Sequence, residues 1–173
     1  MTAKYTRTAR WLHWFLVPLI WGLFAFGKYL GNTEPSLGNF HLWGWHKSIG
    51  LIALVLVWFR LAWRLTHPPP PSVEIPGWQL RAASWVHGFL YALMILTPLF
   101  GWIASSSTGL PISFFGLFDV PLIGPEDEVA EKLLFRVHGL CATLLVGLSV
   151  VHLAAALFNH FVRRNDVLSR MSP

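Results

Sequence analysis

The sequence predicts an all-α fold, a transmembrane four-helix bundle with both termini in the cytoplasm, and three observations lead to this prediction. Residues of the AVILMFWYC set make up 54% of the 173 positions, whereas charged residues make up only 12%, about half the share in soluble domains. Four apolar segments each approach the ~20 residues that a helix needs to cross a bilayer. Basic residues gather near the ends of these segments. We therefore expect a single membrane domain over residues 1–173.

The four expected spans follow one another along the chain and cover residues 11–30, 43–62, 82–105 and 134–162. The first contains no Lys, Arg, Asp or Glu from Trp11 to Gly27, and no small-residue cleavage motif follows it. We therefore expect it to remain as a helix rather than to be removed as a signal peptide. Pro18 and Pro98 lie inside the first and third spans, where membrane helices tolerate proline because neighbouring groups satisfy the freed carbonyls.

The connections between the spans differ in character. The run from Pro68 to Pro71 predicts a stiff, extended linker between the second and third spans. The segment from Ser106 to Leu133 begins apolar, and we expect this first part to lie on the membrane surface. Its second part, residues 126–131, is expected to form an acidic loop. Lys47 and Arg60 lie near the ends of the second span, where long side chains can extend to the lipid headgroups.

The distribution of charge predicts the topology. Four spans place both termini and the proline linker on one face of the membrane, and that face holds nine of the thirteen basic residues. The other face holds the remaining four, together with six of the eight acidic residues. The positive-inside rule makes the first face cytoplasmic. No repeated basic stripe is present, which argues against a nucleic-acid partner. The one cysteine, Cys141, excludes an intramolecular disulfide and a cysteine-based metal cluster.

Histidines inside the spans are the candidate functional residues. Ionisable side chains are costly in a bilayer, so each of them suggests a functional site. His138 and His152 lie 14 residues apart in the fourth span. This spacing corresponds to ~21 Å of helix rise and to nearly the same helix face. One helix therefore offers two imidazoles at two depths. A porphyrin iron needs a ligand on each side, and a helical bundle supplies the second ligand from a facing helix.

The other spans offer partners at both depths. On the outer side His46 is the expected partner, and His41, which we expect in the loop, is a weaker candidate. On the cytoplasmic side His13 and His87 compete for His152, and the spacing does not choose between them. The pattern therefore predicts two haems. The alternative reading of these residues is a histidine-lined metal transporter, which a haemochrome spectrum would distinguish.

Four further residues complete this pattern. His67 and His160 are expected at loop or boundary positions. Gly50 and Gly147, which lie close to or between the expected ligands, would leave room for a flat macrocycle. Small residues also serve ordinary helix packing, so neither glycine decides the question alone.

Several short motifs, in their order and spacing, resemble the bacterial cytochrome b561 family over nearly the whole chain. They are Tyr5-Thr6-Arg7 ahead of Trp11-Leu12-His13-Trp14, Trp45-His46-Lys47 with Gly50, Arg60 with Arg64, His87, Val137-His138-Gly139, His152 with Ala154 to Ala156, and the closing Asp166, Leu168, Arg170 and Met171. The resemblance implies four helices and two b haems in the bacterial inner membrane. It implies that His13 and His152 bind the cytoplasmic haem iron and that His46 and His138 bind the outer one.

The resemblance also implies electron transfer between a membrane quinone, ubiquinone, and a donor or acceptor on the periplasmic side. The family includes superoxide oxidase, so superoxide is one expected donor. Lys47 and Arg136 flank the outer ligands and would form a positive patch for this anion. His87 is left without an iron, and together with Tyr91 it is our candidate for a quinone site. The alternative function is a membrane anchor and electron conduit for a separate periplasmic redox protein, which the acidic segment would dock.

Overall fold

The computed structural model describes residues 4–70, 76–124 and 126–172, and nearly all regular structure in these residues is helical. The helices are α1 (Arg7–Gly31), α2 (His41–Thr66), α3 (Gly77–Ser107) and α4 (Glu128–Phe161). All four are long and apolar enough to cross a membrane. The prediction of four membrane-length helices is confirmed, although each helix is longer than the span that we predicted for it.

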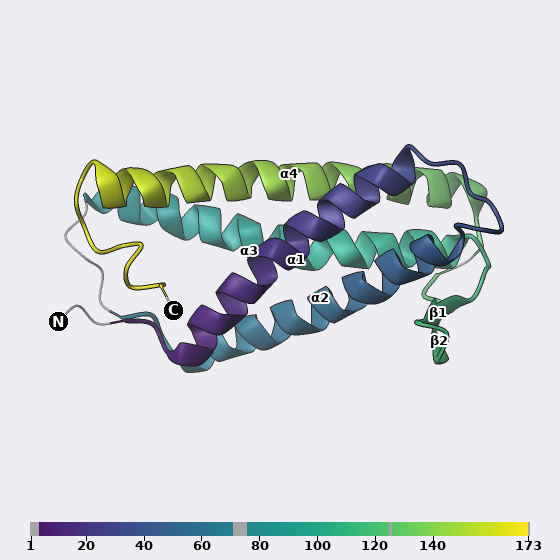
Figure 1. Ribbon diagram of the computed structural model, residues 1–173, viewed down its shortest axis with the longest axis horizontal. Coiled ribbons are helices and arrows are strands. Elements are labelled where there is room, and N and C mark those ends of the chain that lie inside the picture. The colour runs from purple at the N-terminus through teal and green to yellow at the C-terminus, as the bar shows by residue number, and fades with distance from the viewer. Residues whose placement is uncertain (1–3, 71–75, 125, 173) are drawn as a thin grey trace.

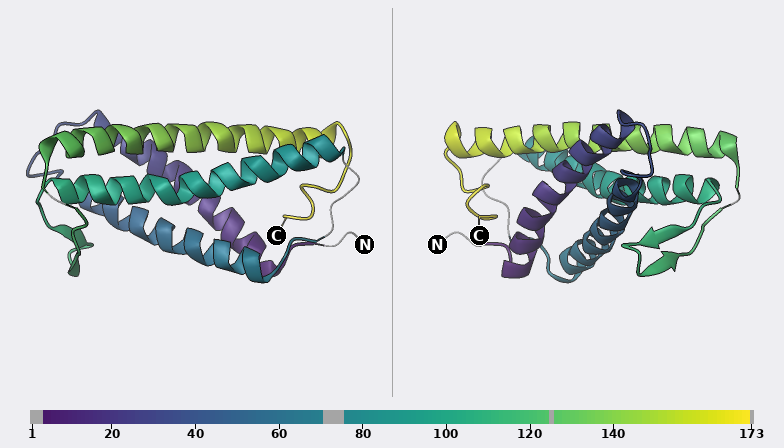
Figure 2. Two further views of the ribbon diagram at one scale, coloured as in Figure 1. Left: turned by 180° about the vertical axis from the view of Figure 1, so that it is seen from behind. Right: turned by 45° about the vertical axis from the view of Figure 1, so that its right-hand side comes forward.

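The helices form an elongated bundle (Figure 1). α3 and α4 lie side by side and antiparallel, and α1 crosses the bundle diagonally, as the two views of Figure 2 also show. Residues 4–6 and the segment after α4 meet at one end, where the Tyr5 N–H donates to the Arg170 carbonyl at 3.2 Å. We call this the terminal end. The opposite end holds the connection between α3 and α4, and we call it the hairpin end.

A short hairpin is the one departure from the expected all-α fold among the described residues. β1 (Ile112–Phe114) pairs antiparallel with β2 (Phe118–Val120). The hairpin lies against α2, because the Ser48 hydroxyl accepts a hydrogen bond from the Phe115 N–H at 3.0 Å. The all-α prediction is therefore wrong for this segment, because the backbone N–H and C=O groups of two strands form hydrogen bonds with each other.

The start of α4 corrects a second prediction. Asp127 caps this helix, because its Oδ1 accepts hydrogen bonds from the N–H groups of Val129 and Ala130 at 2.8 and 2.9 Å. Glu128 and Glu131 then lie in the first turn, where acidic side chains interact favourably with the helix dipole. Residues 128–131, which we expected in a loop, are therefore helical.

α2 begins before and ends after the span that we predicted for it. His41, expected in a loop, is the first residue of α2, and this helix continues to Thr66. Of the proline run, Pro68 to Pro70 have no regular secondary structure, and Pro71 lies outside the described residues.

The outer surface of the bundle is apolar. In the most apolar window of each helix only 6–17% of the residues are buried inside the protein. Large side chains such as Trp85 and Phe161, each 69% exposed, point away from the bundle. A surface of this kind in water would be unusual, and lipid covers it in a bilayer. The ionisable side chains of interest lie instead between the helices.

Candidate functional site

Three histidines meet near the terminal end of the bundle. His13 of α1 and His152 of α4 have ring centroids 6.3 Å apart, with the ring planes at 80°. His87 of α3 lies on another side of His152, with centroids 5.2 Å apart and planes at 67°. All three side chains are half-buried. The structure thus brings both competitors for His152 to the same place.

Two histidines meet at the other depth. His46 of α2 and His138 of α4 have ring centroids 6.2 Å apart, with planes at 86°. His41 does not join them, because its ring packs against Trp45 at 5.1 Å and its side chain is exposed. The structure therefore places His46, the expected partner, beside His138, and it places His41 elsewhere.

The separations of the rings fit a shared metal. Two imidazoles that bind opposite sides of one metal through Nε2, with bonds of about 2 Å, have ring centroids about 6 Å apart. The pairs His13–His152 and His46–His138, at 6.3 and 6.2 Å, match this value. His87 and His152, at 5.2 Å, are too close for ligands on opposite sides.

The backbone of α3 orients His138. Its Nδ1 lies 2.8 Å from the Thr97 carbonyl. Because a carbonyl oxygen can only accept, Nδ1 carries the proton, and Nε2 keeps a free lone pair for a metal. Gly101 makes room for the ring, since a Cβ at this position would lie 2.9 Å from Nδ1. A carbonyl partner of this kind is typical of histidines that bind metals.

His46 has a different environment. Its Nδ1 is buried and has no hydrogen-bond partner among the described residues. Gly27 of α1 packs against the ring, and a Cβ there would lie 3.1 Å from Cε1. Gly27 and Gly101, rather than Gly50 and Gly147, are thus the glycines in contact with the histidines. A Cβ at Gly50 or Gly147 would meet no atom within 4 Å.

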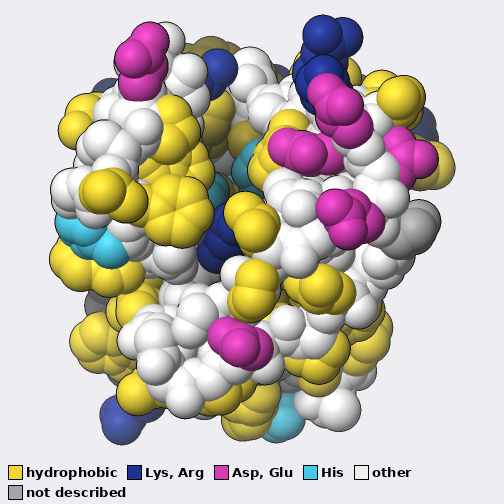
Figure 3. Space-filling view, turned by 90° about the vertical axis from the view of Figure 1, so that its right-hand side faces the viewer, with side chains coloured by type: hydrophobic (Ala, Val, Ile, Leu, Met, Phe, Trp, Pro, Cys, Tyr) yellow, Lys and Arg dark blue, Asp and Glu magenta, His cyan; other side chains and the backbone are white. Residues whose placement is uncertain are grey.

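Lys47 lies beside this second pair. Its side chain is half-buried, and its charge acts on His46 and on Glu131, so it is directed into the bundle end rather than outward to the headgroups. Arg136 is exposed, and no contact between it and Lys47 is present in the described part of the chain. Figure 3 views the hairpin end, where acidic side chains surround a hollow with a basic side chain and histidines visible inside. Of the two cations expected to form a positive patch, Lys47 is therefore half-buried at the hairpin end and Arg136 is exposed.

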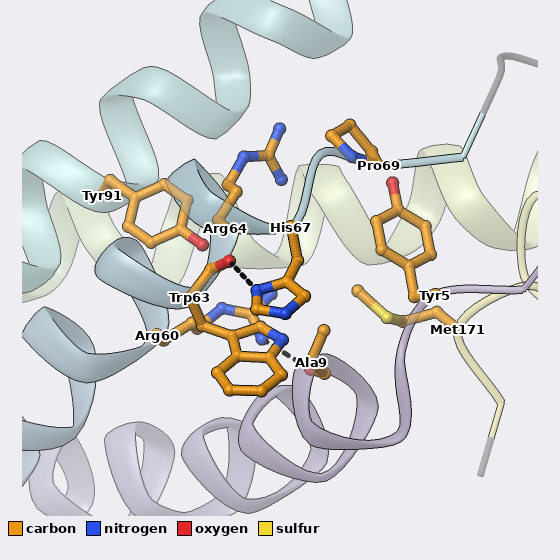
Figure 4. A pocket seen from close by; sticks show the side chains of 9 residues that line it. All are labelled: Tyr5, Ala9, Arg60, Trp63, Arg64, His67, Pro69, Tyr91 and Met171. Carbon is orange, nitrogen blue, oxygen red and sulfur yellow. Dashed lines mark hydrogen bonds between the residues drawn. The ribbon is translucent and has the colours of Figure 1, made fainter.

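Tyr91 and His87 have different surroundings although they share α3. Tyr91 lines a small cavity at the terminal end, together with Tyr5, Arg60 and Arg64 (Figure 4). The volume open to a water molecule is about 20 Å³. His87 does not line this cavity and faces His152 instead.

Arg60, like Lys47, lies in a different place from the one that the sequence led us to expect. It was expected to extend to the headgroups, but its Nη1 donates to the Ala9 carbonyl of α1 at 3.0 Å, inside the bundle. A signal was present, since Arg60 follows His46 by the same 14 residues that separate His138 from His152. Thr97 and Gly101 were also missed, and nothing in the sequence pattern pointed to them.

The remaining histidines stay apart from both groups. His67 follows the last residue of α2 and stacks on Trp63, with ring centroids 4.0 Å apart. His160 lies in the last turn of α4 against Phe161. These boundary positions are the ones we expected.

Four membrane-length helices with interior histidines paired at two depths form the architecture of a membrane-bound b-type cytochrome. Comparison with known proteins agrees. Residues 4–173 match the family described as prokaryotic cytochrome b561. The chain belongs to this family, and it is therefore a multi-pass membrane protein that binds haem b and transfers electrons.

Individual relatives cover most of the chain. Cytochrome b561 homolog 2 of Escherichia coli (strain K12) is 33% identical over 161 residues, which span 92% of this chain and 86% of that protein. Cytochrome b561 homolog 1 of the same strain is 29% identical over 98% of this chain and 97% of that protein. A protein of Yersinia pestis named probable superoxide oxidase CybB is 26% identical over 100% of this chain and 98% of its own length.

Proposed function

We propose that the chain works as one unit that holds two b haems, and that it exchanges electrons between ubiquinone and a donor or acceptor at the hairpin end. One observation carries this proposal: two half-buried histidine pairs, at 6.3 and 6.2 Å, have the separation of imidazoles on opposite sides of one metal. His13 and His152 would hold one haem, and His46 and His138 the other. His87, at 5.2 Å from His152, is not an axial ligand in this proposal.

When bound, each haem supplies a one-electron couple between ferric and ferrous iron. Two histidines would hold each iron, and the group would then supply electron transfer without binding of a substrate to the metal. The two histidines on α4 set the depths of the two sites, which differ by ~21 Å of helix rise. The Thr97 carbonyl accepts a hydrogen bond from Nδ1 of His138, so Nε2 would be the nitrogen that holds the iron.

Replacement of the ligands tests this assignment. We expect H13A or H152A to lose one haem, H46A or H138A to lose the other, and H87A to keep both, as measured by haem content per purified chain. H87A is the matched control, because it also removes an imidazole beside His152. If H87A loses a haem while H13A keeps two, His87 is the ligand and His13 is not.

We place the hairpin end outside the inner membrane and the terminal end in the cytoplasm, because nine of the thirteen basic residues lie at the terminal face. Superoxide is the proposed donor. Two superoxide anions would release one electron each and become two O₂ molecules, and ubiquinone would take up two electrons and two protons to become ubiquinol. Support comes from the similarity to the Yersinia pestis protein and from Lys47, the cation that acts on His46.

A kinetic comparison tests the role of Lys47. We expect K47Q to slow ubiquinone reduction by superoxide roughly tenfold at low salt, because the cation attracts the anionic substrate. K132Q is the control, since Lys132 is exposed and paired with Glu128. Equal rates for K47Q and the unmodified chain would remove Lys47 from the proposal.

For quinone we propose a site next to Tyr91 and His87. The cavity that Tyr91 lines has room for about one water molecule, so the quinone headgroup would lie outside it, on the side of His87. H87A with both haems present and quinone turnover lost would support this site. H87A with quinone turnover intact would exclude His87 from it.

A second candidate function is electron transfer to a separate periplasmic redox protein. The acidic side chains around the hairpin end in Figure 3 favour this candidate, since they would attract a basic partner. The purified chain distinguishes the two functions. Ubiquinone reduction by superoxide with no other protein present supports the first, and dependence on an added protein supports the second.

A further inference from the structure

Arg60 lies at the depth of the His13–His152 pair. α2 and α4 both run from the hairpin end to the terminal end, and Arg60 follows His46 by 14 residues, as His152 follows His138. Equal helix rise therefore puts Arg60 level with His152 and on nearly the same face of α2 as His46. Its charge accordingly acts on His13, His87 and His152.

Two guanidinium groups reach one cavity at this depth. Arg60 and Arg64 both extend from α2 into the space that Figure 4 shows, next to Tyr91. Arg60 donates to the Ala9 carbonyl at 3.0 Å, and it interacts with the Tyr91 hydroxyl. The Arg64 guanidinium lies 5.8 Å from the centre of the Tyr91 ring. Both arginine side chains are half-buried.

No Asp or Glu among the residues that the structure describes lines the cavity. Within the same residues neither arginine forms a salt bridge. Lys47, at the depth of the His46–His138 pair, differs from the two arginines because it interacts electrostatically with the carboxylate of Glu131. A guanidinium that points into a bundle at membrane depth is costly unless an anion accompanies it. Among the described residues, Arg60 uses hydrogen-bond donors for Ala9 and Tyr91. The remaining N–H donors of the two guanidinium groups are available to a ligand with a negative charge and acceptor oxygens.

We propose that Arg60 and Arg64 bind the propionate carboxylates of the haem that His13 and His152 hold. This inference rests on the proposed function. Guanidinium and carboxylate form short, charge-assisted and often bidentate hydrogen bonds. A lipid phosphate is the other anion with this chemistry, but it would lie at the bundle surface, whereas Arg60 points inward to Ala9 of α1. The two arginines are thus positioning residues for one haem only.

Redox titration of the purified holoprotein tests this inference. R60Q/R64Q should keep two haems per chain, and one of the two midpoint potentials should fall. Loss of nearby positive charge favours ferric iron, and we expect about a tenfold change in the ratio of the two oxidation states, which corresponds to 59 mV for one electron. R163Q is the control, because Arg163 is exposed and donates to Gln79 outside the cavity. Unchanged potentials in R60Q/R64Q with both haems present would overturn the inference.

Esterified haem supplies a second test that does not depend on the stability of the variant. The unmodified chain should bind haem at least tenfold more tightly than haem dimethyl ester at the His13–His152 site, and R60Q/R64Q should lose most of this preference. An equal preference in both chains would overturn the inference and leave lipid phosphate as the partner. A chain that binds no haem at all would instead contradict the proposed function.

Discussion

His138 is held on two sides by α3. The Thr97 carbonyl accepts from Nδ1 at 2.8 Å, and Gly101 leaves the space that the ring occupies. His46, its partner at 6.2 Å, has no such acceptor for Nδ1 among the described residues. A hydrogen-bonded imidazole is the better oriented and more basic ligand. We therefore infer that α3, which carries neither histidine of this pair, fixes the position of one of them.

Gly101→Ala tests this inference. The new Cβ would lie 2.9 Å from Nδ1 and 3.0 Å from Cε1 of His138, and the ring has to move. We expect haem affinity at this pair to fall about 10–100-fold, the usual effect of disturbing the support of a ligand. Haem content after dilution measures it. Gly88→Ala in the same helix, where a Cβ meets nothing within 4 Å, should have no effect. Equal haem retention by both variants would contradict the packing argument.

At this scale the sequence predicted part of the site. The spacing of His138 and His152 put two candidate ligands at two depths. His46 lies beside His138, whereas His41 packs against Trp45, and their roles as ligands stay predictions. The sequence could not rank His13 against His87 as the partner of His152, because both lie toward the terminal end of their helices. Only the three-dimensional packing gives ring separations of 6.3 and 5.2 Å from His152.

At the scale of elements, Ser48 joins α2 to the hairpin. This residue is 1% exposed, its hydroxyl donates to the Gly44 carbonyl at 2.9 Å, and it accepts from the Phe115 N–H. Phe115 has a φ of 50°, which is unfavourable for a bulky residue. The sequence did not predict this hairpin, because its strands have three residues each and the bond that holds it comes from a distant helix.

Ser48→Ala should loosen the hairpin without unfolding the bundle. The Phe115 N–H would lose its partner, at a cost of about 1–3 kcal/mol. We expect faster hydrogen exchange over residues 110–120 and unchanged exchange in α4. Thr143→Ala, which removes an exposed hydroxyl bonded within α4, is the control for loss of a hydroxyl group. Faster exchange throughout all four helices would show that Ser48 supports the bundle rather than the hairpin.

The helix ends show what apolar segments leave out. α4 has 34 residues, or about 51 Å at 1.5 Å per residue, whereas the hydrocarbon layer is about 30 Å thick. Hydropathy identifies the part in lipid, and the Asp127 cap marks the true start. Capping residues were therefore the available signal for the starts of α1 and α4, whereas α2 and α3 have no side-chain cap.

For the whole molecule, hydrogen bonds join the first turns of α1 to the last described residues of the chain. The Trp14 indole donates to the Met171 carbonyl at 2.8 Å, and Arg10 donates to the Ser172 carbonyl at 2.7 Å. Both ends of the described chain thus lie on one face, as the even number of spans predicted. Which face of the membrane this is follows only from the charge distribution, and it remains a prediction.

Cysteine labelling tests the orientation. In a Cys141→Ser background, Leu117→Cys in the hairpin should react with an impermeant thiol reagent in intact cells. Thr8→Cys, near the start of α1, should react only after the membrane is opened. The opposite pattern would reverse the topology and place the His46–His138 pair on the cytoplasmic side.

The number of haems bound by the purified chain tests the central claim most directly. A pyridine haemochrome assay against protein mass, made on material produced with ample iron and haem precursor, should give two b haems per chain, and redox titration should resolve two components. One haem per chain would contradict the assignment of two histidine pairs. No haem would contradict electron transfer through this bundle and would favour the transport of a metal by the same histidines.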